Sequence, residues 1–165
     1  MKEQQKKYEL TGEFIEHWSG KKLYRIRSLV SFGVVVAGQL GGFVESEKNL
    51  DQSLSGNAWV YGDARVYGDA WVSGDAEVYG NARVRSYAVI YERKMIFWAS
   101  NVGSENGTLT VFNGKDGLIV TRGCFTGAVD EFLAKSAEVH DDKTKNEYKL
   151  LIEVAKSRIL GVKDE

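Results

Sequence analysis

The sequence contains no proline, one cysteine and two histidines among its 165 residues. A single cysteine cannot form a disulfide within one chain, which fits the reducing interior of a cell. Because 18 glycines accompany the absence of proline, the turns must depend on residues that tolerate positive φ. Positive and negative side chains nearly cancel, 22 against 23, which argues against binding of a nucleic-acid polymer or an acidic membrane.

Long hydrophobic runs are also missing. No stretch approaches the roughly 20 apolar residues of a membrane-spanning helix. The first ten residues, MKEQQKKYEL, lack the apolar segment of a signal peptide. We therefore expect a cytoplasmic protein with no membrane partner. Residues 1–9 are polar, and we expect them to be poorly ordered.

What the sequence does contain is a six-residue repeat from Leu54 to Arg93, which reads LSGNAW, VYGDAR, VYGDAW, VSGDAE, VYGNAR, VRSYAV, IYER. An aliphatic residue recurs every six positions, at Leu54, Val60, Val66, Val72, Val78, Val84 and Ile90. An alanine recurs with the same spacing, at Ala58, Ala64, Ala70, Ala76, Ala82 and Ala88. Glycine followed by Asp or Asn precedes the first five of these alanines. A fixed period of this kind predicts a repeat architecture.

A period of six matches neither a helix nor a flat strand, and it indicates short strands separated by corners. The aliphatic residue and the alanine would point inward, and the Gly-Asp or Gly-Asn pair would form the corner. Such hexads resemble the left-handed parallel β-helix of hexapeptide-repeat proteins, although glycine here follows the aliphatic residue by two positions. In that fold three hexads complete a coil, so residues 18 apart stack. Trp59 would lie on Glu77, and Tyr67 on Arg85.

The outer faces of this repeat carry seven aromatic residues: Trp59, Tyr61, Tyr67, Trp71, Tyr79, Tyr87 and Tyr91. Large exposed apolar patches usually mark interfaces. We interpret these faces first as subunit contacts and second as a ligand surface. Proteins of the hexapeptide-repeat type are typically homotrimers, so the resemblance also implies a trimer.

The segments on either side divide the chain into three parts: a tail and hairpin cap over 1–39, the β-helix over 40–93, and a small sheet with two helices over 94–165. Residues 40–44 could be an irregular first rung, followed by an insertion near 51–53. The N-terminal hairpin would turn at residues 31–33. Strands are expected at 95–99, 107–112 and 118–122. Thr126 would cap the first helix, with Val129, Phe132, Leu133 and Ala137 facing inward, and a capping box at 144–147 would open the second.

The fold class that follows is mainly β, a short left-handed parallel β-helix with an N-terminal strand cap and a C-terminal α+β cap. The arrangement resembles a hexapeptide-repeat family common in phages and prophages. The resemblance is carried by residues 40–50, the GDA repeats, residues 100–110, residues 122–127 and residues 130–132. A phage protein would act in the host cytoplasm. The resemblance favours interference with host defence, including sequestration of nucleotide signals.

Catalytic residues are scarce in the repeat. Hexapeptide-repeat acyltransferases use a histidine on the coil, but His17 and His140 both lie outside it. His140 with Asp141 and Asp142 does not supply the ligand set of a catalytic zinc site. Cys124 is expected to be a buried, inert thiol. We therefore predict no catalytic residue, no metal and no cofactor.

A polar loop after the repeat is the best candidate ligand site. Residues 100–108 gather hydroxyl, amide and glycine groups that suit a small polar ligand: Ser100, Asn101, Ser104, Asn106 and Thr108. Arg122 could add a charge for phosphate, and Trp98 or Phe125 could stack on a base. The alternative is an ordinary turn with its asparagines in the left-handed conformation.

Three functions remain open at this stage. The leading hypothesis is a non-enzymatic homotrimer that binds a small polar, nucleotide-like ligand or a host protein and thereby counteracts host defence. A structural component of a phage particle is the second, motivated by the rigid repeat. An acyltransferase of the hexapeptide type is the third, motivated by the fold alone.

Overall fold

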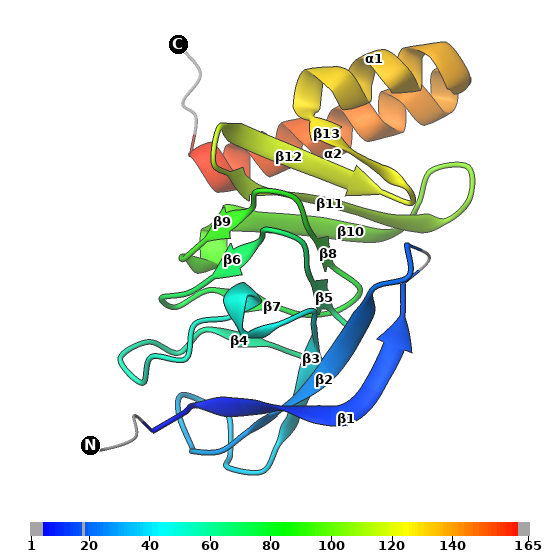
Figure 1. Cartoon of the computed structure of the whole chain (residues 1–165). Helices are drawn as coiled ribbons and strands as arrows, with labels where there is room; N and C mark the ends of the chain where they lie inside the picture. Colours follow the sequence, from blue (N-terminus) through cyan, green and yellow to red (C-terminus); the bar gives the residue numbers. More distant parts are fainter. Residues whose placement is uncertain (1–4, 18, 162–165) are drawn as a thin grey trace.

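The computed structural model describes residues 5–17 and 19–161, which form a mainly β protein with a C-terminal helical part (Figure 1). The N-terminal strands are β1 (Tyr8–Glu16), β2 (Lys22–Ser28) and β3 (Leu40–Val44), followed by the 3-10 helix η1 (Glu47–Asn49). Six two-residue strands follow: β4 (Trp59–Val60), β5 (Arg65–Val66), β6 (Trp71–Val72), β7 (Glu77–Val78), β8 (Arg83–Val84) and β9 (Val89–Ile90). After η2 (Arg93–Met95) come β10 (Ile96–Val102), β11 (Gly107–Gly114), β12 (Gly117–Arg122), β13 (Phe125–Ala128), α1 (Val129–Val139) and α2 (Asp142–Leu160).

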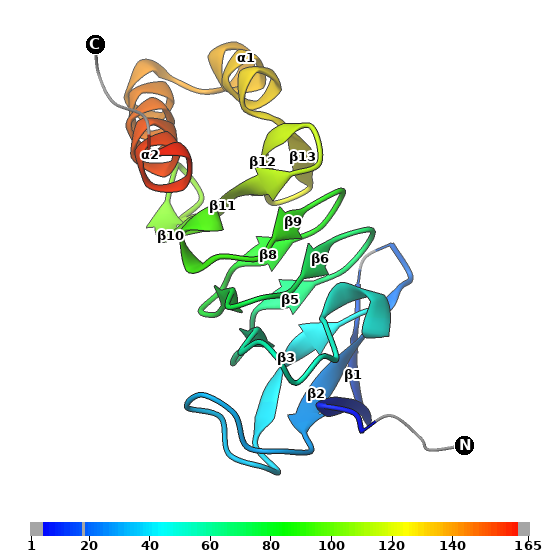
Figure 2. The same cartoon turned by 90° about the vertical axis from the view of Figure 1, so that its left-hand side faces the viewer.

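The six short strands form three parallel pairs, in each of which the partners are 18 residues apart. Trp59 faces Glu77, Arg65 faces Arg83, and Trp71 faces Val89. The predicted spacing between stacked residues is therefore confirmed, and Figure 2 shows the resulting stack of turns. In each pair, backbone N–H groups of the earlier turn donate to carbonyl groups of the later one.

The inward positions of the repeat form one continuous core. Its aliphatic and alanine side chains from Ala58 to Ile90 are at most 1% exposed. Leu54 is the exception among the expected core positions, because it precedes the first paired strand and is 49% exposed. The corners depend on positive φ at Gly62, Gly68, Gly74 and Gly80, and Ser86 adopts the same conformation one hexad later.

The lead-in segment adds a further level beneath the repeat. Phe43 pairs with Arg65, Val44 with Val66, and Leu50 forms a bridge to Val72, each 22 residues apart. Four additional residues therefore lie between this level and the next, which agrees with the insertion expected near 51–53. Because β3 also pairs with β2, the N-terminal hairpin and the repeat share a five-stranded sheet of order β1-β2-β3-β5-β8.

The turn expected at residues 31–33 is displaced by one residue: Phe32 and Val35 bridge across Gly33 and Val34, in the loop between the antiparallel strands β2 and β3. A second hairpin joins β1 to β2. One expectation for the N-terminal region is wrong. The segment expected to be disordered contains Lys7 and Tyr8, which are 1% and 0% exposed. Lys7 Nζ donates to the carbonyls of Gly56 (3.2 Å) and Ala58 (2.8 Å), which face away from the rest of the repeat.

Asn49 likewise donates to backbone carbonyls, at another corner of the repeat. Its Nδ2 donates to the carbonyls of Gly68 (3.2 Å) and Ala70 (2.9 Å). Its Oδ1 accepts from the backbone N–H groups of Glu45 and Ser46, both at 3.1 Å. The side chain is fully buried and makes four hydrogen bonds, so it closes the lower end of the repeat.

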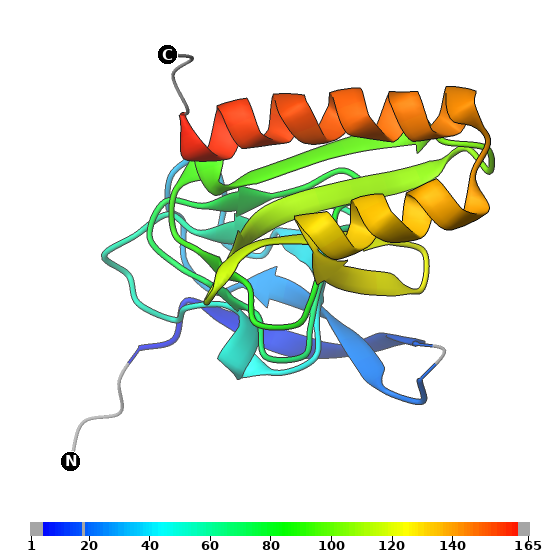
Figure 3. The same cartoon turned by 90° about the horizontal axis from the view of Figure 1, so that it is seen from above.

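A four-stranded antiparallel sheet, in the order β10-β11-β12-β13, covers the upper end. Its inner face contributes Ile96 and Phe112 to the core of the repeat. Helices α1 and α2 lie side by side across its outer face (Figure 3). Both begin at a different residue from the one predicted: Ala128 precedes α1, and Asp141 caps α2 by accepting from the N–H of Thr144 at 2.8 Å.

The inward face of α1 agrees with the prediction except at one position. Tyr148, Ile152, Ala155 and Ile159 of α2 are buried, as are Val129 and Phe132 of α1. In α1, however, Ser136 is buried while Ala137 is exposed. Within the described residues, no helix is both long and apolar enough to cross a membrane.

We predict that Asn49→Ala lowers the free energy of unfolding by about 3 kcal/mol, because several buried backbone groups lose their only side-chain partner. Urea denaturation would measure the change. Asn146→Ala on the exposed side of α2 is the matched control and should stay within about 0.5 kcal/mol of the parent protein. Equal stability of the two variants would contradict the role assigned to Asn49.

Candidate anion-binding site

A basic cavity lies where one side of the repeat meets the C-terminal sheet. It has a volume of about 360 Å³, within the usual range of small-molecule sites. We call it the arginine cleft. Its lining residues are His17, Arg65, Tyr67, Arg83, Arg85, Gly107, Thr108, Arg122, Gly123 and Cys124.

Two of its arginines are forced together by strand pairing. Arg65 on β5 and Arg83 on β8 occupy the same position in hexads 18 residues apart, so the register places them side by side. Like charges directly opposite each other destabilise a sheet. Burial, followed by the charge of Arg65, lowers the pKa of Arg83, although Asp63 partly opposes this effect.

These guanidinium groups are not neutralised by carboxylates. Among the described residues, no Asp or Glu forms an ion pair with Arg65, Arg83 or Arg85. Arg83 donates only to backbone carbonyls, the shortest bond being 2.8 Å to Asn81. The Nε of Arg65 is buried without a hydrogen-bond partner. Buried polar groups normally have one, so the unpartnered Nε adds to the cost of placing Arg65 here.

Arg85 is held rigidly at the other side of the cleft. It donates to Tyr67 Oη (2.9 Å) and to the carbonyls of Gly123 (2.9 Å) and Phe125 (2.6 Å), and its Nε contacts Thr126 Oγ1. Tyr67 and Arg85, which were predicted to lie on each other in successive turns, are joined by this hydrogen bond. The bonds also join the repeat to the turn between β12 and β13. Because these bonds use four of its five N–H donors, Arg85 contributes mainly its positive charge to the cleft.

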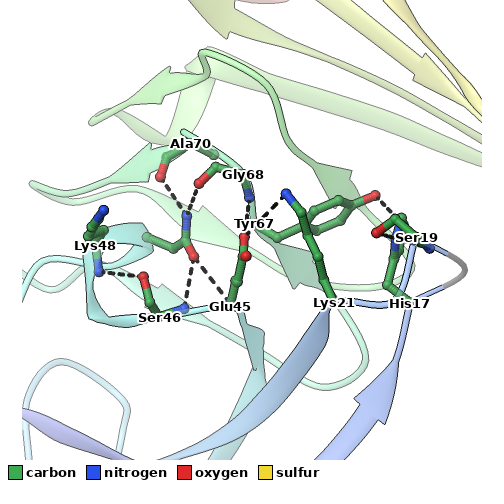
Figure 4. A network of polar contacts seen from close by, with 10 residues as sticks. His17, Ser19, Lys21, Glu45, Ser46, Lys48, Tyr67, Gly68 and Ala70 are labelled. Carbon is green, nitrogen blue, oxygen red and sulfur yellow. Dashed lines mark hydrogen bonds and ion pairs between the residues drawn. The ribbon is translucent and has the colours of Figure 1, made fainter.

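His17 closes the wall of the cleft beside Tyr67. Its Nδ1 lies 2.7 Å from Ser19 Oγ and its Nε2 lies 3.0 Å from Tyr67 Oη (Figure 4). Burial and then the charges of Arg85, Arg65 and Lys21 lower the pKa of His17, with Glu45 opposing them. The imidazole is therefore neutral at pH 7, and the positive potential of the cleft comes from its arginines.

Arg122 forms the boundary between the arginine cleft and a second cavity. Its Nε donates to Tyr148 Oη at 2.9 Å, and its Nη2 lies 3.4 Å from the carboxylate of Glu105. The Glu105 side chain is 79% exposed, whereas that of Arg122 is 15% exposed. Since solvent screens such a pair, Glu105 neutralises Arg122 only weakly.

The sequence-predicted site residues do not gather in one place. Thr108 and Arg122 line the arginine cleft, while Ser104, Arg122 and Phe125 line the second cavity. Ser100 Oγ bonds to Thr108 Oγ1 across the hairpin at 3.0 Å. Asn101 and Asn106 are exposed, with φ of 63° and 55°. These two asparagines therefore follow the alternative expectation of an ordinary turn with left-handed residues.

Trp98 lines a third cavity, of about 440 Å³, together with Tyr79, Arg93 and Arg158. This cavity is larger than the arginine cleft, but Arg93 already pairs with Glu77 at 3.6 Å. Its charge is thus partly neutralised, and the arginine cleft is the better anion site. Among the described residues, no three His, Cys, Asp or Glu side chains are placed to hold a metal ion.

Sequence reasoning missed Arg65, Arg83 and Arg85 because arginines at outward positions are normally solvated. The pairing itself could have been predicted, since the 18-residue spacing that predicted the other ladders also places Arg65 on Arg83. Cys124, expected to be buried, is exposed at the rim of the cleft because it occupies the turn between β12 and β13.

No protein-family model matches the chain, and no curated protein matches it. The assignment of a site therefore depends on the geometry and electrostatics of the arginine cleft.

We predict that Arg65→Met raises the free energy of unfolding by about 0.5–1 kcal/mol at low salt, because it removes a like-charge contact and an unpartnered donor. Urea denaturation would measure it. Arg93→Met, which breaks an exposed ion pair with Glu77, is the control and should give no increase. A loss of stability in Arg65→Met would mean that Arg65 supports the fold.

Proposed function

We propose that this protein is a non-enzymatic binding protein that holds a small phosphate-bearing, nucleotide-like anion in the arginine cleft. The observation that carries the proposal is the pairing of Arg65 with Arg83, beside Arg85 and Arg122, without a carboxylate on the first three. Guanidinium groups bind phosphate oxygens through paired, charge-assisted hydrogen bonds. A phosphate group would neutralise these charges.

The chemistry of the cleft favours retention of the ligand over its conversion. Arginine cannot act as a general base, because its pKa is too high. Burial and the neighbouring arginines lower the pKa of His17, and both of its ring nitrogens lie within hydrogen-bond distance of hydroxyl groups. A phosphate bound here would be held by fixed donors and remain intact.

We extend the proposal to architecture and origin. The stacked hexads would form a short left-handed parallel β-helix of the hexapeptide-repeat type, and the protein would be of phage or prophage origin. By sequestering a nucleotide-like signal in the host cytoplasm, it would counteract host defence. The resemblance described above supports this reading.

The outer aromatic residues support assembly into a homotrimer. Trp71, Tyr79, Tyr87 and Tyr91 are between 38% and 57% exposed. Two of the seven aromatic residues expected on the outer faces are buried within the chain instead. Trp59 packs against Tyr8 and Phe32, and Tyr67 packs against His17. The remaining exposed aromatics are available to a second copy.

To test the binding function, we expect inorganic tripolyphosphate to bind the purified protein, with an affinity that falls as ionic strength rises. Arg65→Met should weaken binding by about tenfold or more, since a hydrogen bond to a charged group contributes about 1.5–3 kcal/mol. Isothermal titration calorimetry would measure the affinity, and phosphorus NMR would show the ligand unchanged. Arg93→Met is again the control. If the parent protein does not bind tripolyphosphate, the proposed function is wrong.

The trimer proposal has a separate test. Light scattering of the purified protein should give three times the 18.4 kDa chain mass. Replacing Trp71 and Tyr87 by serine should lower that mass toward a single chain while the circular dichroism spectrum is retained. A parent protein with the mass of one chain would rule out the trimer without affecting the tripolyphosphate result.

A further inference from the structure

A second cavity, of about 380 Å³, adjoins the arginine cleft across Arg122. Its walls come from the turn between β10 and β11, from β13 and from α1. They include Ser104, Phe125, Lys135, Ser136 and His140. Because Arg122 lines both spaces, one ligand can contact this guanidinium and extend to either side.

The two cavities differ in chemistry. The arginine cleft presents four guanidinium groups, which suit phosphate oxygens. The second cavity presents the partly buried ring of Phe125, which packs edge-to-face on Phe132 at a centroid distance of 5.5 Å. Polar groups surround this apolar surface, namely the ammonium of Lys135 and the imidazole of His140, whose Nδ1 lies 2.9 Å from Ser136 Oγ. An aromatic wall with polar groups at its edge suits a flat heterocycle.

The two cavities are also rigidly connected. Arg122 and Phe125 are partners in the β12–β13 register. Arg85, on the far side of the arginine cleft, donates to the carbonyl of Phe125 at 2.6 Å. The position of the aromatic wall is therefore fixed relative to the phosphate-binding donors, as a ligand with a ring at one end and phosphates at the other requires.

We infer that the second cavity is a subsite for the base of the same ligand, so that the ligand is a nucleoside polyphosphate whose phosphates occupy the arginine cleft. This inference rests on the proposed function. Glu105 stands at the mouth of the subsite and contacts Arg122 through an exposed carboxylate. It repels an incoming phosphate and competes for the same guanidinium.

The test compares ATP, GTP, CTP and UTP with inorganic tripolyphosphate by isothermal titration calorimetry at one ionic strength. At least one nucleotide should bind about tenfold more tightly than tripolyphosphate, since stacking of a base on an aromatic side chain adds affinity of that order. Phe125→Leu and Lys135→Gln should each reduce this advantage and leave tripolyphosphate binding unchanged. Lys149→Gln, at an exposed lysine that lines neither cavity, is the matched control.

Further variants separate the possible results. Arg65→Met should weaken nucleotides and tripolyphosphate alike, and Glu105→Gln should tighten both. If all four nucleotides bind no better than tripolyphosphate, the base subsite is wrong while the anion site stands. If Phe125→Leu and Lys135→Gln both keep the full nucleotide advantage, the base lies elsewhere and the inference is overturned. If tripolyphosphate itself does not bind, the proposed function fails first.

Discussion

The backbone carbonyls at the lower end of the repeat impose the constraint on which the N-terminal half of the structure depends. At the first turn, the carbonyls of Gly56, Ala58, Gly68 and Ala70 accept hydrogen bonds from the segment that precedes the repeat. Buried carbonyls of this kind must find donors. The backbone of β3 supplies some of them, and the side chains of Lys7 and Asn49 supply others. The segment before the repeat therefore supplies the hydrogen-bond donors that its first turn requires.

The upper end of the repeat receives both donors and acceptors from the C-terminal sheet. Thr110 on β11 accepts from the N–H of Arg83 at 3.1 Å, and Thr121 on β12 donates to the carbonyl of the same residue at 2.8 Å. These bonds hold the C-terminal sheet against β8. As a result, Arg122 at the end of β12 lies beside the arginines of the repeat. Closure of the repeat and formation of the arginine cleft follow from the same contacts.

How much of this could be predicted differs between parts of the chain. The period of six predicts the buried alanines and the inserted residues before the repeat. The 18-residue ladders follow from that period together with the resemblance to hexapeptide-repeat proteins, in which three hexads complete a coil. The caps do not repeat, and their partners are distant in sequence. Lys7 was expected in a disordered tail because nothing near it indicates that the carbonyls of Gly56 and Ala58 require a donor. The site was expected in one polar loop, but local composition could not reveal a cavity formed by five separate segments of the chain.

The ladder that carries the candidate site differs from the other two in a way that bears on function. The hexad position of Arg65 and Arg83 is occupied in the other ladders by Trp59 with Glu77 and by Trp71 with Val89. Those pairs place no like charges together, so the architecture itself does not require arginine at this position. Both arginines nevertheless sit on the one ladder that faces β12 and Arg122. Two like charges placed together where a third arginine approaches therefore support the proposed anion site, because the fold does not require them.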